Sequence, residues 1–303
     1  MARNTCKGQA MSDAILLEAD GDRAEISPFG AELSAWRADG VDMIWAKDPK
    51  IWDQTAPVLF PVVGWTRDGR VTVEGKTYPL ALHGFAWKKC FEIAERRPDY
   101  LRLVLLDDAE THALYPFAFR FEVEFQLRKG ALDNNLIVTN TDPRPLPYAC
   151  GLHPAFRWPL AGSGAEHAII FEKPENPDVP IIGPGGLFSK PARRTPLEGN
   201  RLPLEPKMFA RDALCFLNID SRSLVFDNGA GARLKVTLDD FPHVGFWTLP
   251  PAPYLCIEPW TGYGDPEDFH GDLYQKPSMR ILAPGARARH GARFAFERNP
   301  ASG

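Results

Sequence analysis

The sequence has 303 residues, 44% of them hydrophobic and 24% charged, with a formal net charge of −4. This composition is ordinary for a globular protein with a sizeable core, and its slight acidity gives no electrostatic basis for binding nucleic acid or an anionic membrane. No apolar stretch approaches the roughly 18 to 20 residues that span a membrane, and the polar start lacks the apolar core of a signal peptide, so we expect a cytoplasmic protein.

The first residues differ from the rest of the chain. Residues 1–12 are polar, and the first strand-like pattern begins only after Met11, in SDAILLEADG. We predict that this segment is a disordered N-terminal extension. Residues 13–303 show no internal repeat and no linker-like change in composition, so we predict that they form a single domain.

The clearest periodicity in the chain is two-fold. Apolar and polar side chains alternate from Phe119 to Leu127, which predicts a half-buried strand. Similar alternation occurs at 71–73, 234–238 and 294–296. With 29 prolines and 25 glycines, and no window with the apolar period of an amphipathic helix, the sequence predicts an all-β sandwich of large sheets.

Residues 173–208 follow neither period. They are rich in proline, as in KPENPDVPIIGPGG, which favours irregular backbone over a continuous strand or helix. We predict a long surface excursion here, which is either a lid over the functional site or decoration.

The five cysteines form an odd set without a CxxC pair. Most of them stand in apolar segments, which indicates reduced, buried thiols. This pattern disfavours a disulfide scaffold or a zinc cluster.

Three segments place a titratable residue in an otherwise apolar or turn-forming run. They are LALHGFAWKK with His83, YACGLHPAFRWPL with His153, and YLCIEPWTGYGDP with Glu258. A buried ionisable group is costly unless it is paired or used, so all three are candidates for a functional site. The competing interpretation is structural, because a histidine beside glycine or proline is more often a hydrogen-bonded core or turn residue.

Two chemistries suit two histidines, one carboxylate and nearby tryptophans: acid–base catalysis on a carbohydrate, or metal ligation. The wide spacing of the three residues and the absence of HxH and HExxH motifs disfavour a metal site. Nucleotide-binding and serine-nucleophile motifs are also absent. A glycosidase with paired carboxylates stays open, since the following residues are available as partners for Glu258: Asp212, Asp239, Asp240, Asp265 and Glu267.

Five segments in a fixed order carry a family resemblance: PVLFPVVG, GKTYPLALHGFAW, GLHPAFRWPL, FPHVGFWT and CIEPWTGYGD. From about residue 14 to residue 296 the chain resembles the aldose 1-epimerase (galactose mutarotase-like) family, in its branch of shorter bacterial proteins. The resemblance implies a β-supersandwich of large antiparallel sheets. It also implies an isomerase that interconverts the α and β anomers of a free aldose without metal or cofactor.

The resemblance assigns roles to individual residues. His153 is expected to be the general acid at the ring oxygen, Glu258 the general base at the anomeric hydroxyl, and His83 a group that binds and polarises the sugar. Such a pair needs an ionised glutamate and a histidine that can donate a proton. Asp212 is expected to bind substrate hydroxyls, and Trp247 and Trp260 to pack on the sugar ring.

One position departs from the family pattern. Trp65 follows the glycine of PVVG, where many relatives of this branch have arginine. Arg67 or Arg70 is a candidate to supply the guanidinium instead, and Trp65 itself is a candidate to reshape the substrate pocket. The resemblance therefore leaves the identity of the sugar open.

Two other functions stay open. A hexose-6-phosphate 1-epimerase needs cations for the phosphate, and several lie near the motifs: Arg67, Arg70, Lys88, Lys89 and Arg157. A non-catalytic carbohydrate-binding or sensor protein would keep the aromatic residues without needing both His153 and Glu258. We expect a monomer or homodimer whose partner is a small sugar.

Overall fold

Strands are the main regular element of the protein. The computed structural model describes residues 14–162 and 166–298, so the predicted extension at 1–12 lies outside the described residues. Within these ranges the one α-helix is α1 (Ala109–Leu114), and no helix is long and apolar enough to cross a membrane. The all-β prediction is confirmed.

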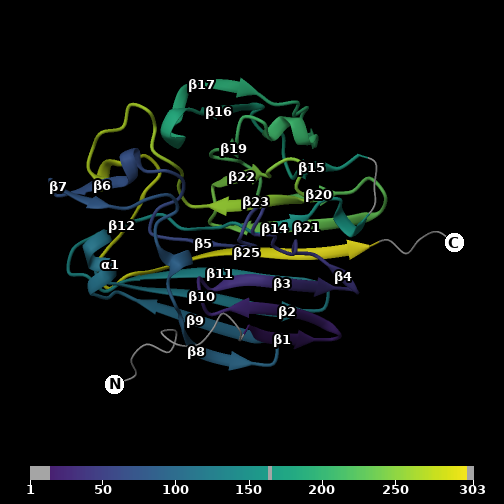
Figure 1. The fold of residues 1–303 in the computed structure, drawn as a ribbon, viewed down its shortest axis with the longest axis horizontal. Helices are drawn as coiled ribbons and strands as arrows, with labels where there is room; N and C mark the ends of the chain where they lie inside the picture. Colours follow the sequence, from purple (N-terminus) through teal and green to yellow (C-terminus); the bar gives the residue numbers. More distant parts are fainter. Residues whose placement is uncertain (1–13, 163–165, 299–303) are drawn as a thin grey trace.

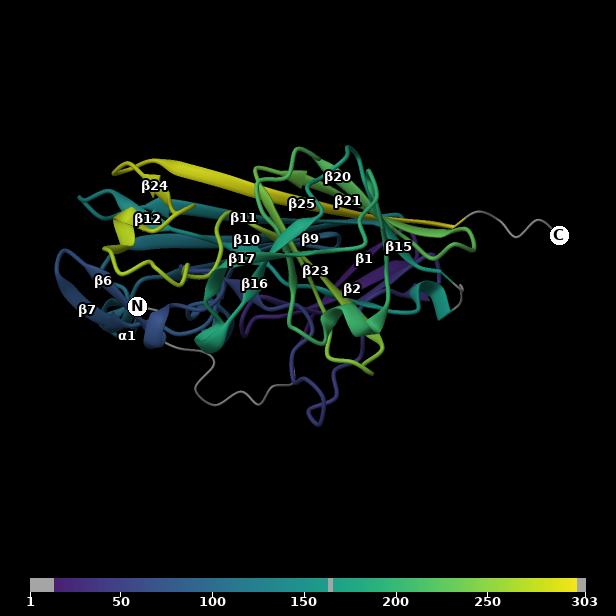
Figure 2. The same ribbon diagram turned by 90° about the horizontal axis from the view of Figure 1, so that it is seen from above.

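The largest sheet has nine antiparallel strands, which form a broad layer in Figures 1 and 2. In spatial order they are β18 (Arg201–Pro203), β15 (Ala168–Phe171), β20 (Ser223–Asp227), β21 (Ala232–Asp239), β25 (Arg287–Arg298), β11 (Ala131–Asn140), β10 (Phe119–Arg128), β9 (Tyr100–Leu106) and β8 (Glu92–Arg97). The alternating segments predicted at 119–127, 234–238 and 294–296 fall in β10, β21 and β25.

Strand β10 confirms the two-fold pattern, with one exception on its polar face. The apolar residues from Phe119 to Leu127 are at most 1% exposed. Glu122 is also buried, because three arginines surround its carboxylate. Arg120 is 3.0 Å away, and Arg102 and Arg287 are within 3.7 Å. Alternation alone did not predict this burial, since the arginines come from three different strands.

A six-stranded sheet carries Trp247, Glu258 and Trp260, and two of its strands flank His153. Its strands are β19 (Leu214–Phe216), β22 (His243–Trp247), β23 (Tyr254–Trp260), β13 (Gly151–Leu152) and β5 (Val58–Leu59), with β14 (Ala155–Arg157) also paired to β23. Every residue of β23 is buried. Leu255 and Ile257 join the main apolar core, so Glu258 and Trp260 lie on the opposite face of the strand.

Smaller units complete the fold. They are a four-stranded sheet of β1 (Ile15–Ala19), β2 (Asp22–Ser27), β3 (Glu32–Ala38) and β4 (Val41–Asp42), and the pairs β6 (Arg70–Val73) with β7 (Lys76–Pro79), β12 (Leu146–Tyr148) with β24 (Arg280–Leu282), and β16 (Asp178–Ile182) with β17 (Phe188–Arg194). Short 3₁₀ turns occur at Arg67–Gly69, Ala86–Lys88, Leu160–Gly162, Pro184–Gly186, Pro206–Phe209 and Leu273–Gln275. The alternation predicted at 71–73 falls in β6.

Segment 173–208 is more regular than predicted. It contains the β16–β17 hairpin, seen at the top of Figure 1, and β18 at the edge of the nine-stranded sheet. Pro180, Pro191 and Pro203 lie inside these strands. Proline is tolerated there because these strands lie at sheet edges or in a two-stranded pair, where a missing N–H breaks no central ladder.

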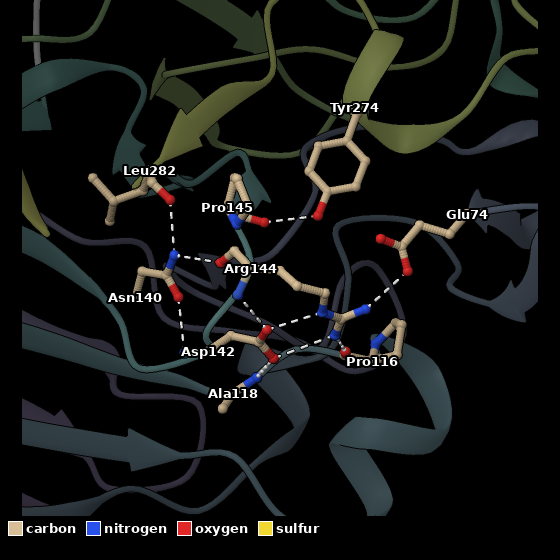
Figure 3. Close-up of polar contacts among 9 residues, drawn as sticks. All are labelled: Glu74, Pro116, Ala118, Asn140, Asp142, Arg144, Pro145, Tyr274 and Leu282. Carbon is tan, nitrogen blue, oxygen red and sulfur yellow. Dashed lines mark hydrogen bonds and ion pairs between the residues drawn. The ribbon is translucent and has the colours of Figure 1, made fainter. Parts of the chain in front are cut away.

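A polar network fixes the loop between β11 and β12 (Figure 3). The Arg144 guanidinium donates to Asp142 at 2.9 Å, to Glu74 at 3.1 Å and to the carbonyl of Pro116. Asn140 donates to the carbonyls of Arg144 and Leu282, both at 2.8 Å. The loop leads into β12 and then β13, so the network fixes the start of the segment that delivers His153.

Candidate active site

Strand register places His153 opposite Glu258. Gly151 pairs with Trp260, and Ala155 pairs with Cys256. Counting inward from either pair brings His153 level with Glu258, so the two side chains project from the same face as a cross-strand pair. His153 Nε2 lies 3.1 Å from Glu258 Oε2, and both side chains are buried.

Two glycines leave room for Trp260 beside Glu258. A Cβ at Gly151 would lie 2.6 Å from Trp260 Cδ1, and one at Gly245 would lie 2.4 Å from Trp260 Cη2. Both distances are far below van der Waals contact. Glycine at these two positions therefore allows the indole to lie next to the carboxylate.

His83 is held by Gly64 through two hydrogen bonds. Its backbone N–H donates to Gly64 O at 3.0 Å, and its Nδ1 accepts from Gly64 N at 3.1 Å. An accepting Nδ1 places the proton of the neutral imidazole on Nε2, which makes that atom a donor. Burial and the neighbouring His153 lower the pKa of His83, which keeps the ring neutral. The residue adopts a φ of +60°, an uncommon conformation that often marks a functional position.

Burial favours the uncharged forms of His153 and Glu258. It lowers the pKa of His153 to about 4 and, with a contribution from Asp212, raises the pKa of Glu258 well above its usual value. Both shifts therefore favour the neutral pair, a protonated Glu258 beside a neutral His153, over the ion pair. The sequence led us to expect an ionised Glu258 and a His153 that can donate a proton. That ionised pair differs from the neutral pair by the transfer of one proton across the 3.1 Å contact.

The pair lies in a cavity of about 630 Å³. Aromatic side chains form much of its wall: Trp52, Trp65, Trp87, Phe188, Trp247 and Trp260. Of the five carboxylates considered as partners for Glu258, Asp212 is the one that lines the cavity. Among the described residues that line it there is no lysine or arginine.

Most of the predicted site residues meet in this cavity, but two do not. His83, His153, Glu258, Asp212, Trp65, Trp247 and Trp260 all line it. Arg67 and Arg70 instead line a separate cavity of about 170 Å³. Arg67 donates its Nε to Phe269 O at 3.0 Å and another N–H to Glu267 O, which turns its guanidinium away from the site. Neither arginine therefore lines the cavity that holds Trp65.

Comparison with known proteins shows the family of this chain. The sequence profile described as Aldose 1-epimerase matches residues 13–294. The chain belongs to the aldose 1-epimerase family. The plasmid-encoded and chromosomal forms of protein LacX from Lactococcus lactis subsp. lactis are each 28% identical to it over 273 residues, which cover 86% of this chain and 91% of the relative.

Solved structures show the same fold. A galactose mutarotase-like protein from Lactobacillus casei superposes with a TM-score of 0.87 at 27% identity, covering 94% of this chain and 100% of that one. A galactose mutarotase related enzyme from Lactobacillus acidophilus gives 0.84 at 26% identity, covering 95% and 100%. The predicted family and its β-supersandwich are thus confirmed.

This aldose 1-epimerase family member has site residues that the sequence did not reveal. The ring of Trp52 lies 5.4 Å from that of His153 and 5.4 Å from that of Trp247. Cys215 lines the cavity, and Cys256 lies beside the catalytic candidates. Cys256 and Glu258 are two residues apart in a strand, so the sequence could have predicted that the cysteine lies on the same face as the glutamate. Cys150, Cys215 and Cys256 are free, buried thiols, as predicted, whereas Cys90 is disulfide-bonded, so the expectation of reduced cysteines is wrong at that position.

The β16–β17 hairpin forms one wall of the cavity. Ile182, Gly186 and Phe188 contribute to the lining. The indole of Trp65 lies directly on Gly186, where a Cβ would be 1.9 Å from Trp65 Cδ1. The proline-rich segment is therefore part of the site. Its Gly186 contacts Trp65, which also lines the cavity.

Arg193 on β17 supports Asp212. Its guanidinium donates to Asp212 O at 2.9 Å and to Ala213 O at 2.8 Å. Asp212 has a φ of +75°, and its carboxylate accepts from Ala213 N at 2.7 Å. The hairpin thus also holds the loop that presents a carboxylate to the cavity.

Proposed function

We propose that this protein is an aldose 1-epimerase that interconverts the α and β anomers of a free aldose by general acid–base catalysis. The observation that carries the proposal is the direct opposition of His153 and Glu258, 3.1 Å apart, inside an aromatic-walled cavity. A buried histidine–carboxylate pair that shares one proton can both accept and return a proton without forming a net buried charge.

Ring opening requires two proton transfers. Glu258 removes the proton of the C1 hydroxyl while His153 donates a proton to the ring oxygen as the C1–O5 bond breaks. Rotation about C1–C2 presents the other face of the aldehyde, and the same residues return the protons as the ring closes. In this proposal His83 donates a hydrogen bond from Nε2 to the sugar, which its accepting Nδ1 supports.

The composition of the cavity favours an unphosphorylated sugar. A phosphate group calls for arginine or lysine, and none lines the cavity among the described residues. Lys89 pairs with Glu110 at 2.7 Å, Lys88 lies over the ring of Trp87, and Arg157 donates to Ile44 O. Arg67 and Arg70 line the second cavity. None of the cations that left a hexose-6-phosphate 1-epimerase as an alternative function therefore lines the cavity of His153 and Glu258.

The proposal is tested by measuring anomer interconversion with polarimetry or proton NMR on free hexoses, pentoses and hexose 6-phosphates. We expect acceleration of at least one free aldose and loss of about 100- to 10,000-fold in Glu258→Gln, the usual contribution of a positioned acid or base. Glu122→Gln, which changes a buried glutamate outside the cavity, is the matched control and should stay active.

Other outcomes would contradict the proposal in distinct ways. Acceleration confined to hexose 6-phosphates would identify the phosphate-specific enzyme. Sugar binding with no acceleration, unchanged by His153→Ala and Glu258→Gln, would identify a carbohydrate-binding or sensor protein.

A further inference from the structure

We propose that His153, Cys256 and Glu258 form a binding site for Zn²⁺, and that the bound ion excludes the sugar. Binding of the ion does not depend on the proposed function, whereas its inhibition of mutarotation does. Metal binding is not a step of the proposed reaction, because Cys256 takes no part in the proton transfers.

The strand geometry brings three ligand atoms together. Cys256 and Glu258 are two residues apart on β23 and therefore project from the same face. His153 lies opposite Glu258 and diagonally from Cys256 in the register. The imidazole nitrogen, the thiol sulfur and the carboxylate oxygen all lie within 4.8 Å of one another. Small side-chain rotations bring such atoms to zinc bond lengths of about 2.0–2.3 Å.

The donor set selects the ion. One nitrogen, one sulfur and one oxygen suit Zn²⁺, whereas Mg²⁺ and Ca²⁺ prefer sites built from oxygen alone. His153 and Glu258 line the cavity, so a fourth coordination position would open into it. Three protein ligands and one open position is the arrangement of an accessible zinc site rather than a closed structural one.

Charge balance also favours a divalent ion. When Zn²⁺ binds, the thiol of Cys256 releases one proton, and the pair of His153 and Glu258 releases its shared proton. The product contains a thiolate, a carboxylate, a neutral imidazole and the ion, with a net charge of zero. A neutral complex is the one that a fully buried site tolerates best, since all three residues are at most 7% exposed.

The surroundings of His153 predict reversible binding. Resident zinc sites orient each histidine through a hydrogen bond from its second ring nitrogen. Nδ1 of His153 makes no hydrogen bond to another of the described residues. The ion should therefore be removable by a chelator, and it should compete with sugar because it occupies the atoms that handle the protons.

The chain provides a matched pair of cysteines for the test. Cys215, like Cys256, is a buried free thiol whose pKa is raised, first by burial and then by Glu258. It lies in the same row of the sheet as Glu258 but two strands away, because Gly245 stands between them in the register. Cys215 is therefore too far away to join the three ligands.

The experiment uses Cd²⁺ as a spectroscopic probe of thiolate coordination in the full-length, chelator-treated protein. We expect one Cd²⁺ per chain, seen as a cadmium–thiolate absorption band in wild type and Cys215→Ala. The band should be absent in Cys256→Ala, and Zn²⁺ should displace Cd²⁺. In the mutarotation assay, Cys256→Ala should need at least about tenfold more Zn²⁺ for half-inhibition than Cys215→Ala, since even losing a group that only orients a ligand costs about 10- to 100-fold in affinity.

A band that persists in Cys256→Ala, or that disappears in Cys215→Ala, would overturn the proposal. Anomalous diffraction from Cd²⁺-soaked wild-type crystals gives an answer that needs no variant. A peak between His153, Cys256 and Glu258 supports the site, and a saturating ion elsewhere refutes it. Cd²⁺ binding at the three residues in a protein without mutarotation would refute the proposed function and leave the metal site intact.

Discussion

The proton shared by His153 and Glu258 sets the pH dependence of the site. The pair gains a second proton only as the pH falls toward the His153 pKa of about 4, and loses its own only as the pH rises through the raised pKa of Glu258. We expect kcat/KM, corrected for the solvent reaction, to fall on the acid side near pH 4. An acid limb near 6.5, the ordinary histidine value, would show that burial does not control this pair.

Individual residues differ in how far the sequence predicted them. His83, His153 and Glu258 were predicted because a titratable group in an apolar run is conspicuous. The position of Arg67 outside the cavity was not predicted, because its direction is set by carbonyl groups about 200 positions away in the chain. Trp52 was missed because it lies in a loop, where no periodicity indicates the direction of a side chain.

At the scale of elements, the β16–β17 hairpin offers a test of the cavity wall. Gly185 and Gly186 have nearly equal φ values of +73° and +75°, so alanine strains the backbone equally at both. Only at Gly186 would a Cβ collide with Trp65; at Gly185 the nearest neighbour is 3.9 Å away. We expect Gly186→Ala to move the hairpin from Trp65 and raise KM several-fold, whereas Gly185→Ala keeps KM close to wild type.

Combining Gly186→Ala with Trp65→Ala removes the collision and checks the cause. Recovery of the hairpin position would appear as restored protection of its amides from hydrogen exchange. Equal effects of Gly185→Ala and Gly186→Ala on KM would mean that backbone strain, and not the Trp65 contact, determines the position of the wall.

The loop between β11 and β12 depends on Arg144. Burial alone would raise the pKa of Asp142, but hydrogen bonds from Arg144 and from the backbone of Ala118 lower it. Arg144→Met removes these charged hydrogen bonds and should cost on the order of 2 kcal/mol in the free energy of unfolding. The loss should be present at neutral pH and should shrink as the pH falls below 3.8, the ordinary pKa of aspartate, and Asp142 becomes protonated. Urea unfolding at pH 7 and pH 3 measures it, and an equal cost at both would contradict the ion-pair explanation.

The elements themselves were predicted where periodicity is strong. Strands β10, β21 and β25 follow alternation that local chemistry dictates. The strands of segment 173–208 were not predicted, because prolines conceal the pattern and their pairing depends on partners elsewhere in the fold. Sheet register, which brings Cys256 beside His153, is likewise a property of the folded chain and not of any one segment.

For the whole molecule, neutral buried histidines limit stability in acid. Burial lowers the pKa of five of the seven histidines: His83, His153, His167, His243 and His290. Below the unfolded value of about 6.5 the unfolded chain binds more protons than the folded one, so stability falls as the pH falls. We expect the melting temperature to drop steadily between pH 6.5 and pH 4. A melting temperature that stays constant over this interval would show that these histidines take up protons without unfolding.

The aromatic wall of the cavity has an optical consequence. Five of the eight tryptophans, Trp52, Trp65, Trp87, Trp247 and Trp260, line this one cavity. We therefore expect an occupant that displaces water from these rings to change the indole emission of the molecule as a whole. The protein is thus its own label-free indicator of occupancy, which allows sugars and metal ions to be screened before any reaction is followed.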